Sequence, residues 1–209
     1  MALFALLLAA AALPVNGVDE RPRRGTFVET SLGVFTAMGG SAAFSNAQPY
    51  LGIAFGREIG ERAAVFISLG IGAASASCYQ PDAPTGKCLA ADSFGATFFE
   101  GGASYGFGIA SRLLLGLKMV AGLSDLSPGP VCQANRSDCL SGSGMPDHLL
   151  GFHLGTGLAL DYDTHLDHFA VGLDALIRYT LARYTPASGE SQTLGFPSLA
   201  VMPRIRYVF

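Results

Sequence analysis

The residues of this chain whose types and spacing could support chemistry are four cysteines, four histidines and a small set of charged residues. The cysteines form two close pairs in sequence, Cys78 with Cys88 and Cys132 with Cys139. In an oxidising compartment these pairs predict two disulfides, each worth about 2–3 kcal/mol by loop-closure entropy. Pairing between the two segments is the alternative. A zinc site made of all four thiolates is disfavoured because neither spacing is that of a structural zinc site.

A second polar cluster lies in the stretch DYDTHLDHF, which spans residues 161–169. Its side chains include Asp161, Asp163, His165, Asp167 and His168, and carboxylates and imidazoles together can bind a divalent metal. Alternate residues of a strand point to opposite faces, however, so these side chains are not expected to converge. A solvated polar turn is the expected structure, and a docking point for a periplasmic partner is the alternative.

Composition limits the classes of protein to which the chain can belong. The 209 residues suit a single domain, half of them are hydrophobic, and only 14% are charged. The net charge of −3 and the lack of a basic cluster argue against nucleic acid as a partner. Beyond the N-terminal stretch the sequence has no run of ~20 apolar residues, so its apolar content must be distributed over short segments.

The N-terminal stretch MALFALLLAAAALPVNG predicts a secretory signal peptide over residues 1–17. Neither Lys nor Arg precedes the apolar run, so its positive charge would come only from the α-amino group, or the true start lies upstream. A membrane anchor is the alternative, but the run is short for a span. Residues 18–25 are then expected to be a periplasmic lead, and residues 26–209 the folded domain.

Eight segments after residue 25 alternate large apolar residues with small or charged ones. This period of two predicts β-strands, because an amphipathic helix needs i, i+3, i+4 spacing and each glycine would cost it ~1 kcal/mol. The expected strands are residues 27–37, 49–57, 64–73, 93–107, 112–123, 149–162, 168–181 and 198–209.

The connections between these segments alternate between long and short. The short ones are residues 58–62, 108–111 and 163–166, and the long ones include residues 124–147 and 182–196. Transmembrane β-barrels sort their connections in this way, with short periplasmic turns and long external loops. Because lipid offers no hydrogen bonds, a spanning sheet must close on itself. The sequence therefore predicts an all-β fold, an eight-stranded antiparallel up-and-down transmembrane β-barrel.

An eight-stranded barrel has an interior just wide enough for side chains. Charges of both signs are assigned to this interior by their parity in the strands, which predicts a buried ion-pair network that plugs the barrel. A narrow charged pore is the alternative. The residues assigned to the interior are Glu29, Glu100, Asp161 and Asp174, with Arg112, Lys118, Arg178, Arg204 and Arg206, and His153 nearby.

The last segment, SLAVMPRIRYVF, has an apolar or aromatic residue at every second position and ends on Phe209. With Val201, Ile205 and Tyr207 it resembles the C-terminal signature that the β-barrel assembly machinery reads in bacterial outer-membrane barrels. The overall plan resembles the small OmpA/OmpX-like class. That resemblance implies an outer-membrane location with cell-surface loops, contact with outer-membrane lipid, and protein partners in the envelope or at the surface.

Two stretches, residues 50–78 and 160–179, resemble small barrel-type surface proteins that are associated with adventurous gliding motility in myxobacteria. That resemblance implies a component of a motility or adhesion complex, rather than an enzyme. Lipid A deacylases of similar shape carry a His-x-Ser pair, and none of the four histidines here is followed by Ser at that position. We therefore expect a non-catalytic surface scaffold without cofactor or metal. A lipid A-modifying enzyme and a narrow channel are the alternatives.

Overall fold

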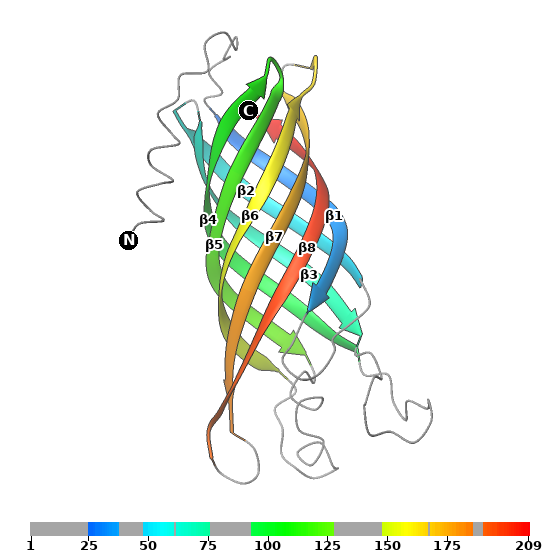
Figure 1. Ribbon diagram of the computed structural model, residues 1–209, viewed down its shortest axis with the longest axis vertical. Helices are drawn as coiled ribbons and strands as arrows, with labels where there is room; N and C mark the ends of the chain where they lie inside the picture. Colours follow the sequence, from blue (N-terminus) through cyan, green and yellow to red (C-terminus); the bar gives the residue numbers. More distant parts are fainter. Residues whose placement is uncertain are drawn as a thin grey trace.

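The computed structural model describes residues 25–37, 48–60, 62–75, 93–127, 148–166, 168–185 and 190–209. They form eight strands that follow one another around a closed barrel (Figure 1). Each strand is antiparallel to both neighbours, and the last strand pairs with the first, so the fold class predicted from the sequence is confirmed. The strands are β1 (Thr26–Ala37), β2 (Gln48–Ile59), β3 (Ala63–Ser75), β4 (Ser93–Ala110), β5 (Leu113–Ser127), β6 (Leu149–Asp163), β7 (Phe169–Tyr184) and β8 (Gln192–Val208).

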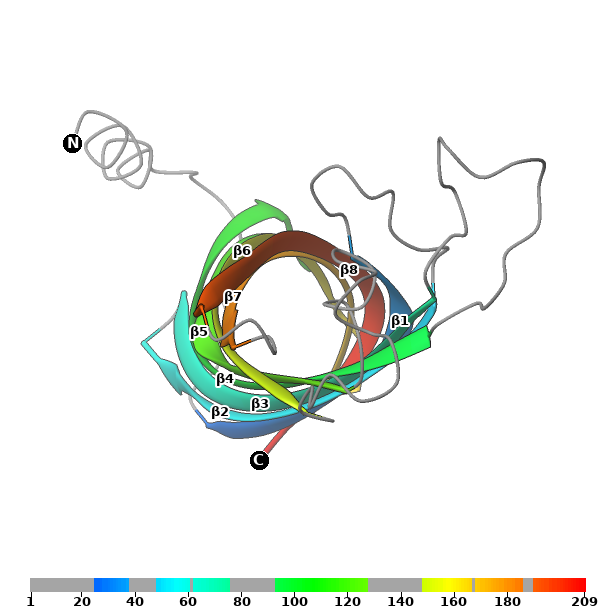
Figure 2. The same ribbon diagram turned by 90° about the horizontal axis from the view of Figure 1, so that it is seen from below.

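The period-2 pattern of the sequence has a direct physical consequence in these strands. In β2 the side chains of Leu51, Ile53 and Phe55 are exposed on the outer face, whereas the intervening Gly52 and Ala54 are buried. A sheet that pleats in this way places one parity outside the barrel and the other parity in the lumen. Figure 2 shows the strands as a ring around that lumen.

The two ends of the barrel differ in the length of the connections between their strands. The turns between β2 and β3, β4 and β5, and β6 and β7 lie at one end, and so does the C-terminus (Figure 1). Gly60 in the first of these turns has a φ of 74°, a left-handed conformation that glycine adopts without a steric penalty. We call this the short-turn end. The strand ends that flank residues 38–47, 76–92 and 128–147 lie at the other end, the long-connection end.

Several strands are longer than the sequence predicted. β7 runs to Tyr184 and β8 begins at Gln192, so they are joined by residues 185–191 and not by residues 182–196. β5 likewise continues to Ser127. A backbone ladder can extend past the apolar band into water, where alternating side chains no longer mark it. The alternation of apolar residues therefore indicates how much of a strand lies in the lipid-facing apolar band, and it underestimates the length of the whole strand.

Some sequence-based predictions lie outside the described residues. These are the signal peptide, the periplasmic lead up to residue 24, and all four cysteines, Cys78, Cys88, Cys132 and Cys139. The part of the chain that the structure describes contains no helix that is both long and apolar enough to cross a bilayer.

Candidate functional site

The inner wall of the barrel holds the charged residues that the sequence assigned to it, with one exception. Each of these side chains is at most 9% exposed and extends into the lumen from its strand. They are Glu29, Glu100, Lys118, His153, Asp161, Asp174, Arg178, Arg204 and Arg206.

Arg112 is the exception, and its assignment to the interior was wrong. It lies in the tight turn between β4 and β5, just before β5 begins at Leu113. Its Nη1 donates to Nδ1 of His165 in the β6–β7 turn, at 2.6 Å, and this contact is exposed. The parity rule holds only inside a paired strand, and the register of β4 with β5 shifts between Gly108 and Ala110, immediately before this turn.

Arg112→Ala is therefore expected to change the free energy of unfolding by less than about 0.5 kcal/mol, as surface substitutions usually do. The measurement is urea-dependent unfolding of the refolded barrel, followed by the gel shift between folded and unfolded forms. A loss as large as that of a buried arginine would show that the Arg112–His165 contact contributes to the fold.

The charges near the short-turn end form one network, which we call the Glu29 cluster. Glu29 accepts from Lys118 Nζ at 3.1 Å, from Arg206 Nη2 at 2.9 Å and from Arg204 Nη1. Asp174 accepts from the same lysine at 2.5 Å and from Arg204 Nε at 2.7 Å. Asp161 completes the cluster, 2.6 Å from Arg204 Nη2. Cations and anions alternate, so each buried charge has an opposite charge beside it.

A second network, the Glu100 cluster, lies deeper in the lumen. Glu100 accepts from Arg178 through both oxygens, at 2.5 Å from Nε and 3.1 Å from Nη2. His153 Nε2 lies 2.9 Å from the same carboxylate, and Ser68 donates to it at 3.2 Å. Arg178 also donates to the hydroxyl of Tyr50 at 2.9 Å. The guanidinium lies 4.7 Å from the ring centroid of Phe98, close enough for a cation–π contact.

Apolar side chains separate the two clusters and close the lumen beyond them. Val120, Leu176 and Met202 lie between the clusters in strand order. Beyond the Glu100 cluster, toward the long-connection end, buried side chains form what we call the apolar plug. Its largest members are Phe35, Phe98, Leu126, Leu149 and Phe196, each at most 5% exposed.

Tyr50 and the plug aromatics were not among the sequence-predicted site residues. They occupy the same strand parity as the inward charges and glycines, so the alternation of the sequence did indicate that they face the lumen. Large apolar side chains were nevertheless assigned to the lipid-facing side by default. Glycine makes room for them: a Cβ at Gly70 would overlap the hydroxyl of Tyr50.

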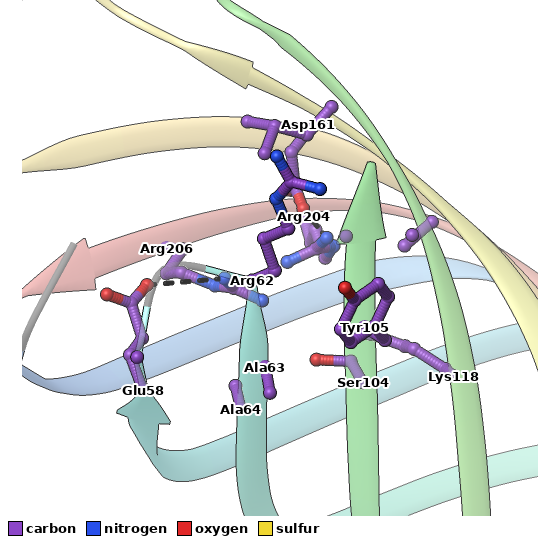
Figure 3. A pocket seen from close by; sticks show the side chains of 15 residues that line it. Glu58, Arg62, Ala63, Ala64, Ser104, Tyr105, Lys118, Asp161, Arg204 and Arg206 are labelled. Carbon is purple, nitrogen blue, oxygen red and sulfur yellow. Dashed lines mark ion pairs between the residues drawn. The ribbon is translucent and has the colours of Figure 1, made fainter. Parts of the chain in front are cut away.

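Two small cavities in the described part of the barrel are lined by residues of these clusters. One, of about 50 Å³, opens at the short-turn end and is lined by Glu58, Arg62, Asp161, Arg204 and Arg206 (Figure 3). Arg206 faces Glu58 across it, with 3.9 Å between Nη1 and Oε1. The other, of about 40 Å³, lies between the two clusters. Lys118 lines both cavities and stands between them.

The outer face is apolar, and a group of its aromatic residues packs together at the short-turn end. Tyr207 packs edge-on against Phe169 and Phe209, both at 4.9 Å between ring centroids, and Tyr105 packs against Phe107 at 5.0 Å. Such aromatic belts mark the membrane interface of outer-membrane barrels. The predicted assembly signal requires its residues to share the outer parity of β8 and its end, and this holds for Val201, Ile205, Tyr207 and Phe209. That the assembly machinery reads this signal stays a prediction.

The described part of the chain contains no group of three or more His, Cys, Asp or Glu residues that could hold a metal ion. In the stretch that begins at Asp161 the described side chains separate, and Asp167 lies outside the described residues. Asp161 is buried against Arg204, whereas the hydroxyl of Thr164 donates to the carbonyl of Phe169 at 2.7 Å and orders a surface turn.

Comparisons with known proteins identify the fold. No family model and no curated protein matches the chain. Among solved structures it is similar to Neisserial surface protein A, with a TM-score of 0.58, 17% identity, and coverage of 88% of this chain and 97% of that one. It is also similar to the outer membrane protein AlkL in lipid bilayers, with a TM-score of 0.50, 14% identity, and coverage of 94% and 95%. At these identities the similarity shows the fold alone, which is that of the small eight-stranded outer-membrane barrels. It does not bear on gliding motility.

Proposed function

We propose that this chain is an outer-membrane anchor whose barrel is a rigid, non-catalytic scaffold that holds its long connections at the cell surface. The observation that carries the proposal is the contrast between its two faces. Outside, side chains such as Ile53, Leu154 and Ile205 are more than half exposed, which suits acyl chains and not water. Inside, Arg178 is 1% exposed, and Phe35, Phe98 and Leu126 are fully buried.

The layering of the lumen favours a scaffold over a channel. A conducting path needs continuous water from one end to the other. Here the Glu29 cluster, the layer of Val120, Leu176 and Met202, the Glu100 cluster and the apolar plug follow one another along the axis, and the two cavities of about 50 and 40 Å³ lie on the short-turn side of the plug. A cavity of this size holds only a few water molecules.

The partner proposed for the long-connection end is another protein of the envelope or surface. Residues 76–92 and 128–147 are long for connections and each contains a cysteine pair, so disulfides would give that end a fixed binding surface. One structure of similar fold is named a surface protein. The sequence resemblance to barrels associated with gliding motility makes a motility or adhesion complex the first assembly to test.

Planar-bilayer recording of the refolded protein tests the sealed interior. We expect no steady conductance steps from the unmodified chain. The matched variant is Phe98→Ala/Phe196→Ala, which removes two rings of the apolar plug and is expected to produce at least brief openings. Regular conductance steps from the unmodified protein would contradict the scaffold and favour the channel.

Two further measurements address the rest of the proposal. A protease site inserted at residue 135 is expected to be cleaved in intact cells, whereas one inserted after Ser111 is cleaved only when the outer membrane is permeabilised. Lipid A mass spectra with and without the gene are expected to be identical. An altered spectrum would support the enzyme in place of the scaffold.

A further inference from the structure

We infer that a small cluster of ordered water molecules binds inside the barrel, between the Glu100 cluster and the apolar plug. The proposed site is an arc of polar residues on four consecutive strands, Ser124 on β5, His153 on β6, Thr180 on β7 and Ser198 on β8. Each is at most 1% exposed. The atoms Ser124 Oγ, His153 Nδ1, Thr180 Oγ1 and Ser198 Oγ have no hydrogen-bond partner within the described part of the barrel.

The strand register places these residues next to one another. His153 lies directly opposite Thr180, and the residue opposite His153 on β5 is Gly122, two positions from Ser124. Ser198 lies two positions from Phe196, which is opposite Thr180. Directly opposed side chains of a sheet start about 5 Å apart and diagonal ones about 7–8 Å, so a single water molecule can bridge two of them.

Arg178 adds a fifth polar atom to the same arc. It is opposite Ser198 on β8, and its Nη1 has no hydrogen-bond partner among the residues described, whereas its Nε and Nη2 are bonded to Glu100. Native proteins leave few buried polar atoms unpaired, and they commonly fill such places with water that makes about three hydrogen bonds. Five unpaired atoms in one arc therefore point to a bound species and not to independent defects.

Glycine lets the side chains of the arc lie against the barrel wall. Gly122, Gly151 and Gly155 have inward positions on β5 and β6, within the arc, and carry no side chain. A Cβ atom at Gly151 would lie 3.0 Å from Ser124 Oγ, and one at Gly155 would lie 3.0 Å from Arg178 Cγ. Ser124 and Arg178 therefore occupy the room that these glycines leave, and a water molecule would bind on the side of their polar atoms that faces the lumen.

The chemistry of the arc selects water over an anion. His153 Nε2 lies 2.9 Å from a Glu100 oxygen and must carry a proton to bond with it. The other atoms of the arc are its three hydroxyls, which can both donate and accept, and Arg178 Nη1, which offers only N–H. Water can donate to the hydroxyl oxygens and accept from Arg178, whereas a halide cannot donate at all.

Thr180→Val tests the inference through the sign of its effect. If the hydroxyl binds water, its loss raises the equilibrium constant for unfolding roughly tenfold, the effect of one hydrogen bond. If the arc is dry, the hydroxyl is an unpaired polar group, and the nearly isosteric valine lowers that constant instead. The matched control is Thr30→Val, at a lipid-facing position where no such increase is expected.

Ser124→Ala and the double variant Ser124→Ala/Thr180→Val show whether the site is shared. Residues that bind one water cluster are coupled, so the combined effect should be smaller than the product of the two single effects. Strict additivity, or a more stable Thr180→Val protein, would overturn the inference. Both readouts are the urea midpoint of the refolded full chain.

Crystals of the unmodified protein give a test that does not depend on variants that fold. We expect water density within hydrogen-bond distance of Thr180 Oγ1 and His153 Nδ1. In crystals soaked in bromide, an anomalous peak at this position would replace the water assignment with an anion. An arc without density at a resolution that shows other buried waters would also overturn it.

Discussion

Glu29→Gln is expected to lower the free energy of unfolding by about 3–5 kcal/mol, the cost of removing one partner from a buried ion-pair network. The glutamine keeps the shape of the side chain but removes the carboxylate that binds Lys118, Arg204 and Arg206 together. Arg206 is affected most, because its remaining carboxylate, that of Glu58, lies at 3.9 Å. The measurement is urea-dependent unfolding of the refolded barrel, followed by its gel shift.

Two matched variants separate this effect from a general response to a lost carboxylate. Glu190→Gln changes an exposed glutamate between β7 and β8 and is expected to have almost no effect. Adding Arg206→Gln to Glu29→Gln removes the stranded cation, so the double variant should be less damaged than the sum of the single variants predicts. If Glu29→Gln unfolds at the same urea concentration as Glu190→Gln, the Glu29 cluster contributes nothing to stability.

The sequence was sufficient to place most of these charges in the lumen, because period 2 fixes the face of a residue without knowledge of the fold. Glu29, Asp174 and Arg204 each stand among alternating apolar residues, and each is buried. Parity failed for Arg112 because a turn residue has no partner strand to fix its direction. Strand ends were underestimated in β7 and β8 for a related reason, since the ladder continues where the side-chain pattern stops.

The partners within the lumen could not be predicted in this way. Lys118 reaches Glu29 on β1 and Asp174 on β7, and these contacts depend on the height of each residue along the barrel axis. That height depends on how far each strand is shifted along its neighbours. The shift accumulates around all eight strands, so it cannot be derived from the sequence of any one strand. The division into a Glu29 cluster, a Glu100 cluster and an apolar plug is therefore a property of the closed sheet.

Arg178→Met is expected to lower the free energy of unfolding by a similar amount, about 3–5 kcal/mol. The arginine is the largest fully buried side chain of the barrel among the residues described, and it holds Glu100 with two hydrogen bonds and Tyr50 with a third. Methionine fills much of the same volume, so the loss reports the charge and its hydrogen bonds more than packing. Glu100 is left with Ser68 and His153 as its polar neighbours.

The informative comparison is the double variant Arg178→Met/Glu100→Leu. Replacing a whole buried ion pair with apolar residues of similar volume is often neutral or stabilising by about 1–4 kcal/mol, because neither charge then needs to leave water. The double variant should therefore recover most of the stability that Arg178→Met loses, although His153 and Ser68 lose a common acceptor. Full recovery would mean that the Glu100 cluster specifies how the lumen is filled and adds little to stability. If the double variant is no more stable than Arg178→Met, the hydrogen bonds to Tyr50, Ser68 and His153 carry the stabilisation. The fold would then require a charged lumen, and the charges would do more than fill its volume.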